Sequence, residues 1–177
     1  MTASTIKSEN VTNIEALPRV SLSRKTGYIQ TVIDQDAIPT TSTDEVADTM
    51  LFCPIPAEAV ILDVLILSDD LDSSTGLVLD WGLAYSGIGG QQRALSKSSG
   101  DLLDVDCFAT LLAHQAALTT WTSVRFEADD IVDVKKEAWE VGGATSNPGG
   151  LLYVVAKVTT QGATPVAGDL VVRVDYI

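Results

Sequence analysis

The stretch Ala59-Val-Ile-Leu-Asp-Val-Leu-Ile-Leu67 leads through the polar residues 68–75 into Leu77-Val-Leu-Asp-Trp-Gly-Leu-Ala-Tyr85. Both apolar runs are rich in β-branched, leucine or aromatic side chains, and the first is the strongest strand pattern in the chain. A polar connection of this kind is typical of a turn between two strands. We therefore expect the two runs to pair as an antiparallel hairpin.

Similar short apolar runs continue on both sides of this pair. Tyr28–Ile33 is expected to be extended, and Asp34–Asp44, with Pro39 and several threonines, to be a loop. Val46–Cys53 is expected to be a strand that Pro54 closes, because proline cannot donate to a sheet ladder. Further strands are expected at residues 121–126, 131–134, 151–159 and 169–177.

Residues 101–120 show a different spacing. Their apolar side chains recur at intervals of three or four, which predicts one short helix; the residues concerned are Leu102, Val105, Phe108, Ala109 and Leu112. Many short strands with a single helical insertion and no alternation of strands and helices predict an all-β fold, an antiparallel β-sandwich or jelly roll. A Rossmann-type or barrel enzyme scaffold is disfavoured.

The chain has 177 residues and 46% hydrophobic side chains, enough for one packed domain with a short arm. Its net charge is −13, yet residues 1–25 carry four basic and two acidic side chains. We assign residues 1–45 to an N-terminal arm, extended or partly disordered, and residues 46–177 to the sandwich. A basic arm before an acidic domain favours docking onto a neighbour, although a loose polar terminus has the same composition.

The strongly acidic body repels phosphate, so neither free nucleic acid nor an anionic membrane is an expected partner. Cys53 and Cys107 stand far apart without metal-ligand spacing, and we expect both to be small core residues. No apolar run approaches the roughly 20 residues that cross a bilayer, and none resembles a secretory leader. A soluble protein made in a reducing cytosol fits these features.

Candidate catalytic and metal-binding residues are few. The chain has one histidine, His114, and a base needs an orienting acid and a nucleophile, so a structural or surface role is expected. Asp69, Asp70 and Asp72 resemble a calcium loop, but the EF-hand pattern places Gly and Glu where this chain has Thr75 and Trp81. An acidic, solvated hairpin tip is the preferred interpretation. We expect no metal, no cofactor and no enzymatic activity.

The three tryptophans, Trp81, Trp121 and Trp139, lie within or beside apolar runs. Core packing is the expected role of each, with an inter-subunit contact as the alternative. A sandwich that lacks a catalytic constellation favours a structural or binding module.

The order of these motifs resembles that of the jelly-roll decoration, or cement, proteins of tailed-bacteriophage heads. Residues 55–72 leading into 77–83 resemble the family's strand, acidic turn and strand ending in Gly-Leu. Residues 136–143, followed by 147–150, resemble its tryptophan-bearing turn before a glycine loop, and residues 153–176 resemble its closing hairpin. The likeness does not extend to residues 1–45.

The resemblance implies a virion protein on the outer surface of a capsid. Such a protein bridges major capsid subunits, often as a homotrimer at local three-fold points, and so strengthens the shell without chemistry. The charge asymmetry adds the hypothesis that Arg19, Arg24 and Lys25 contact the capsid. The family has no active site to transfer.

A receptor- or carbohydrate-binding module of a phage tail or fibre is the alternative, because jelly rolls also present loops to sugars. It would use exposed aromatic side chains beside the loops 86–100 and 142–150, where the sequence offers Tyr85 and Trp139. A cupin-like metal enzyme would need several histidines and is disfavoured.

Overall fold

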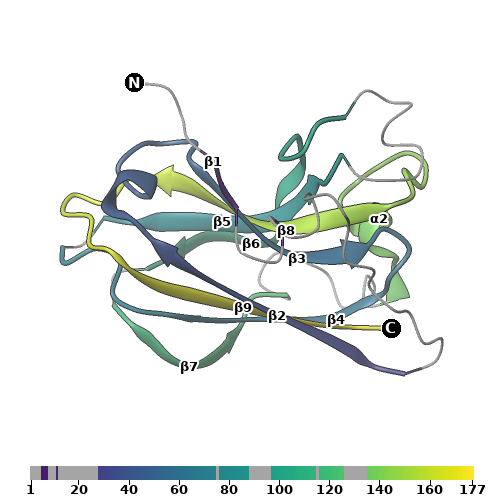
Figure 1. Ribbon diagram of the computed structural model, residues 1–177, viewed down its shortest axis with the longest axis horizontal. Coiled ribbons are helices and arrows are strands. Elements are labelled where there is room, and N and C mark those ends of the chain that lie inside the picture. Colours follow the sequence, from purple (N-terminus) through teal and green to yellow (C-terminus); the bar gives the residue numbers. More distant parts are fainter. Residues whose placement is uncertain are drawn as a thin grey trace.

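Two stacked β-sheets make up the folded body in the computed structural model (Figure 1), which describes residues 5–7, 11, 28–74, 76–87, 97–114, 116–125 and 135–177. One sheet has five strands in the order β1-β3-β8-β5-β6, and the other has four in the order β2-β9-β4-β7. The strands are β1 (Thr5–Lys7), β2 (Gln30–Ile38), β3 (Thr49–Pro56), β4 (Ile61–Ser68), β5 (Val78–Tyr85), β6 (Leu102–Ala113), β7 (Leu118–Ser123), β8 (Leu151–Thr160) and β9 (Gly168–Tyr176).

The pairings are antiparallel except that β1 runs parallel to β3. The described helices are a 3-10 turn, Thr40–Ser42, and α2, Ala138–Val141. The expected all-β sandwich with one short helix is confirmed. The helix lies at Ala138–Val141 and not where it was expected. It begins after Glu137, and the carboxylates of Glu137 and Glu140 form a capping box in which each accepts a hydrogen bond from the backbone amide of the other residue.

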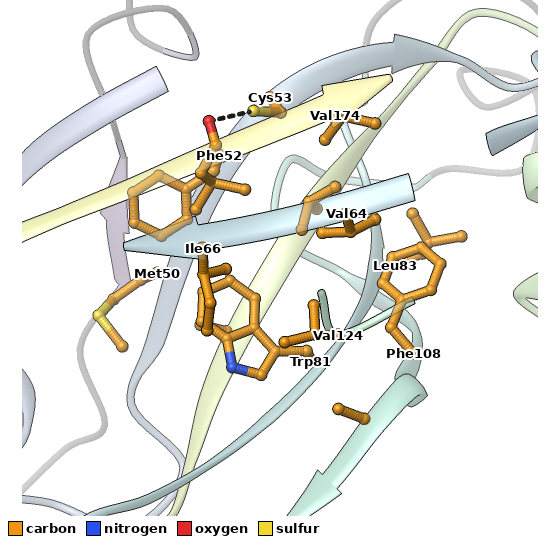
Figure 2. Close-up of a cluster of buried hydrophobic side chains, with 14 of the residues drawn as sticks. Met50, Phe52, Cys53, Val64, Ile66, Trp81, Leu83, Phe108, Val124 and Val174 are labelled. Atoms are coloured by element: carbon orange, nitrogen blue, oxygen red, sulfur yellow. Dashed lines mark hydrogen bonds between the residues drawn. The ribbon is translucent and has the colours of Figure 1, made fainter. Parts of the chain in front are cut away.

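The core fills the space between the inner faces of the two sheets (Figure 2). Trp81 of β5 lies at its centre, fully buried, with the Phe52 ring stacked at a centroid distance of 6.5 Å. Val64 and Ile66 of β4 approach from the opposite sheet. Cys53 and Cys107 are both buried and carry free thiols, as expected of core residues.

Most of the described residues between 101 and 120 lie in the strands β6 and β7, so the prediction of a helix there is wrong. β6 pairs with β5 through several shifts of register, and Leu111 has a φ of 55°. Each bulge resets the two-residue alternation of a strand. The apolar side chains of β6 therefore recur at irregular intervals that resemble a helical spacing, although only Cys107, Phe108 and Ala109 are buried.

The predicted hairpin of residues 59–67 and 77–85 is also wrong. β4 lies in the four-stranded sheet and β5 in the five-stranded sheet, so the acidic turn crosses between sheets. The same correction applies to the closing pair, because β8 and β9 lie in opposite sheets. A short polar connection can join two strands of one sheet or cross to the opposite sheet. Which of the two occurs depends on the strands, distant in sequence, with which each strand pairs.

Two further boundaries differ from the expectation. β3 continues to Pro56, and Pro54 lies opposite Tyr153, since a register shift after Phe52 and a φ of 41° at Cys53 accommodate the proline. β2 continues to Ile38 and pairs along its whole length with β9, so residues 34–38 are not a loop. This strand falls within the segment 1–45 that the sequence assigns to an arm. Residues 126 and 131–134 lie outside the described part.

Gly82, in the middle of β5, marks a close approach of backbones. A Cβ at this position would overlap the carbonyl oxygen of Asp104 and the backbone of Val105 in β6. Only glycine lets the bulged strand cross β5 at this distance.

Replacement of Gly82 by alanine should destabilise the protein by about 1–3 kcal/mol, since β6 must move away from β5. Thr110→Ala, at an exposed position of β6, is the control and should change the free energy of unfolding by no more than about 0.5 kcal/mol. Urea unfolding of the two variants measures both values. Equal stabilities would contradict the close approach.

Candidate functional site

The residues proposed to contact a capsid, Arg19, Arg24 and Lys25, lie outside the described part of the chain. Residues 5–7 and Val11, the described residues before Tyr28, pack against the five-stranded sheet. β1 pairs with Thr49–Leu51, and Val11 is fully buried in a second apolar cluster with Leu51, Ala84, Tyr153 and Val155. The N-terminal segment therefore contributes to covering the outer face of this sheet.

The two sheets differ in what covers them. β3, β5 and β8 are buried almost without interruption, so the five-stranded sheet is buried on both faces in its centre. β4 and β9 instead alternate buried residues with half-buried ones. The outer face of the four-stranded sheet is therefore the accessible sheet face of the described body, on the lower side in Figure 1.

The centre of this face is apolar. Register places Ile33, Arg173, Leu65 and Ser123 in one row across the four strands. The next row holds Gln35, Val171 and Leu67, with Trp121 beside them. An antiparallel sheet with a solvated face ordinarily carries polar residues at such outward positions. Ile33 is 54% exposed and Trp121 41% exposed. Trp121 does not pack in the core, so the prediction is wrong for this residue. The same prediction is confirmed for Trp81, which is fully buried.

Both ends of the face are acidic. Asp63 and Asp175 lie opposite each other at one end, and Asp69 and Asp169 lie side by side at the other, where the Asp69 carboxylate accepts a hydrogen bond from the Asp169 amide. Arg173, the cation among the residues named on this face, forms an ion pair with Asp175 at 2.8 Å. The surface is thus an apolar centre between two acidic ends, and we call it the open face.

Two shallow pockets adjoin the second acidic end. One, of about 170 Å³, is lined by Leu67, Val171 and residues 117–119, with Asp69 and Asp169 at its polar side. The other, of about 390 Å³, shares these two aspartates and borders Pro39.

The pKa of Asp36 is raised by burial and by the neighbouring charges of Asp34 and Asp169. A hydrogen bond from the Ala37 amide works in the opposite direction and lowers it, but does not outweigh them.

His114, on which a catalytic role would depend, is buried at the end of β6. The indole nitrogen of Trp81 donates a hydrogen bond to Nε2 at 3.4 Å, so Nδ1 holds the proton of the neutral ring. Burial lowers the pKa of His114 to about 4. The expected structural role fits this neutral, inaccessible imidazole.

The acidic turn is only partly solvated. Asp69 and Asp70 are exposed as expected, but Asp72 is fully buried, which corrects the prediction for that residue. Its carboxylate accepts hydrogen bonds from the amides of Thr164, Ser74 and Leu77 and from the Ser74 hydroxyl. Burial works to raise the pKa of Asp72, and these hydrogen bonds outweigh it and lower the pKa. Asp72 therefore ties the loop after β4 to the loop before β9.

Three further carboxylates are buried and were not predicted from the sequence, those of Asp34, Asp48 and Asp80. Asp34 of β2 accepts a hydrogen bond from the Cys53 amide at 3.0 Å, and Asp80 of β5 accepts one from the Leu111 amide at 2.8 Å. Cys53 and Leu111 both have positive φ, so Asp34 holds a bulge on a strand of the opposite sheet and Asp80 holds one on the strand beside its own. The available signal was an aspartate within an apolar strand, as in Leu79-Asp80-Trp81.

The residues considered for sugar binding have partners within the protein. Tyr85 is 7% exposed, and the Lys97 ammonium lies 5.0 Å from the centre of its ring. The Trp139 indole nitrogen donates a hydrogen bond to Glu137 at 2.6 Å. Tyr85 is therefore not available to stack on a sugar, and Trp139 is half-buried against the core.

A search of the described residues finds no group of three or more His, Cys, Asp or Glu side chains that could hold a metal ion. None of the helices in that part of the chain has the length and apolar character of a membrane span.

The pH dependence of stability tests the state of His114. Its folded pKa of about 4 lies below the ordinary value of 6.5, so the unfolded chain takes up a proton first as the pH falls. The contribution of His114 to stability should be constant above pH 6.5 and decline by roughly 3 kcal/mol towards pH 4. Subtracting the curve of His114→Gln, measured by urea unfolding, isolates this slope. A histidine that titrates near 6.5 by NMR would contradict the assignment.

Asp72 should act at lower pH and through the same linkage. Because its folded pKa is lowered, its stabilisation is complete above the ordinary value of 3.8 and disappears as the pH falls through the folded pKa. Asp72→Asn should lower the free energy of unfolding by about 1–3 kcal/mol at pH 7, since amide protons would face amide donors. The difference from the unchanged protein should shrink below pH 4, whereas the exposed control Asp44→Asn should show neither effect.

Comparison with known proteins bears on the fold. No protein-family model matches the chain, and no curated protein matches it. A chain in the structure described as "Capsid of Ralstonia phage GP4" is similar, with a TM-score of 0.60 and 18% sequence identity over 98% of this chain and 97% of that one. The "Cyanophage Pam1 capsid asymmetric unit" aligns with a TM-score of 0.43, 19% identity and coverage of 92% and 95%. The first likeness shows that this chain shares its fold, along nearly its whole length, with a chain found in a phage capsid.

Proposed function

We propose that this chain is a structural virion protein that binds the outer surface of a bacteriophage capsid and stabilises the shell by bridging major capsid subunits. The observation that carries the proposal is the shared fold with a chain of the Ralstonia phage GP4 capsid over 98% of the present sequence. That likeness agrees with the motif order from residue 55 to residue 176, which resembles jelly-roll decoration proteins.

The physical properties of the described body suit this role. Two tightly packed sheets provide a rigid module, and the candidate base His114 is buried and neutral. Several weak contacts to different subunits bind strongly together, because each contact raises the effective concentration of the next. We infer a homotrimer at local three-fold points and no enzymatic activity.

The basic side chains of the N-terminal segment supply one proposed contact. Arg19, Arg24 and Lys25 stand before a body that carries most of the net charge of −13. A cationic segment can pair with acidic groups on the shell, which the acidic side chains of the folded body cannot do.

A receptor- or carbohydrate-binding module remains the alternative role. It is less well supported because Tyr85 is buried and the Trp139 indole is bound to Glu137.

Addition of the purified chain to capsids that lack it should raise the temperature at which the shells break, with saturation at a fixed number of copies. The triple variant Arg19→Gln, Arg24→Gln, Lys25→Gln should bind more weakly, with a smaller dependence on salt, as each lost cation removes a screened attraction. Deletion of residues 1–25 is a poorer test, because it also removes β1 and the buried Val11.

The matched control is Lys97→Gln, Lys135→Gln, Lys136→Gln, which removes the same charge from the folded body. Equal binding of the two triple variants would contradict the arm contact. Shells whose breaking temperature does not change with the unmodified chain would contradict the stabilising role.

A further inference from the structure

We propose that the open face of the four-stranded sheet is the surface on which the capsid partner docks, and that this partner presents an apolar centre flanked by lysine or arginine at both ends. The inference rests on the proposed function, which supplies the identity of the partner as a shell protein. The surface and the chemistry that it requires follow from the structure.

The first step is the contrast between the two sheets. The five-stranded sheet already has both faces buried in its centre, with Leu51, Tyr153 and Val155 in a second cluster around Val11. The open face has half-buried Leu65, Leu67 and Val171 at outward positions of its two central strands. Apolar residues at these positions are stabilised only when another surface removes them from water.

The second step is the type of side chain on the two edge strands of the open face. Trp121 lies on the edge strand β7 and Ile33 on the edge strand β2, at 41% and 54% exposure. Arg173 lies between them in the central strand β9. Tryptophan and arginine are enriched among the residues that dominate binding energy in protein interfaces, usually around an apolar centre.

The third step excludes a second copy of this chain as the occupant. Asp63 and Asp175 lie at one end of the open face, and Asp69 and Asp169 at the other. Alignment of two apolar centres would therefore place acidic groups on acidic groups in either orientation. The ion pair with Arg173 offsets the charge of Asp175 alone, so Asp63 at one end and Asp69 and Asp169 at the other would still face like charges.

The same charges define the partner. A surface with basic side chains at both ends would pair them with these aspartates while its apolar centre covers Leu65 and Leu67. The pocket of about 170 Å³ beside Leu67 and Val171 offers a seat for one apolar side chain, and Asp69 and Asp169 border it. A basic residue next to that side chain in the partner would meet both carboxylates.

The test compares variants of the full chain for binding to capsids that lack it. Trp121→Ser, Ile33→Thr and Asp169→Lys should each weaken binding about tenfold or more. The matched controls lie on β6 of the other sheet: Leu102→Ser, at a residue 40% exposed, and Asp106→Lys, with the same change of charge. The controls should bind like the unmodified chain, and circular dichroism should show all five variants folded.

Hydroxyl-radical labelling of assembled particles provides a second measurement that needs no variant. Trp121 and Ile33 should be strongly protected in particles compared with the free protein, and Leu102 should not be. If the unmodified chain binds shells while the open-face variants bind equally well and Trp121 stays reactive, the inference is overturned and the proposed function stands. If the unmodified chain does not bind shells at all, both are overturned.

Discussion

The burial of the five-stranded sheet on both faces is the constraint on which the rest of the structure depends. Its central strands, β3, β5 and β8, must be apolar almost throughout, and Gly82 must lack a side chain so that β6 can approach β5. Backbone amides face the buried carboxylates of Asp34, Asp72 and Asp80 and offset the cost of their burial. Surface for a partner is left mainly on the other sheet, whose outward positions combine apolar and acidic side chains.

Much of the fold is accessible from the sequence because apolar runs between turn residues determine strands locally. The runs around Leu65 and Leu83 are strands as predicted. Their pairing was not predictable, because a turn of the same length can join neighbours in one sheet or cross to the opposite sheet. The helix predicted near Phe108 failed for a different reason: bulges held by a distant carboxylate, that of Asp80, break the alternation that identifies a strand.

The candidate site was less accessible than the fold. Asp69, Asp70 and Asp72 look alike in sequence, yet only the third is buried, and one of its amide donors comes from a loop about 90 residues away. Trp121 lies in an apolar context but on an edge strand, so its exposure depends on which strands are edges. The open face is formed by four strands, and no local sequence pattern predicts their order in the sheet. Charge, in contrast, is readable directly, and the acidic character of the body was evident from composition.

The described body thus combines a two-sheet sandwich, buried carboxylates that accept hydrogen bonds from backbone amides, a buried histidine with a lowered pKa, and one sheet face with an apolar centre and acidic ends. The measurement that tests this account most directly is the number of copies of the chain in purified phage particles, by quantitative mass spectrometry against the major capsid protein. The account predicts a number comparable to that of the shell subunits. A handful of copies per particle, or none, would contradict a protein that covers and strengthens the shell.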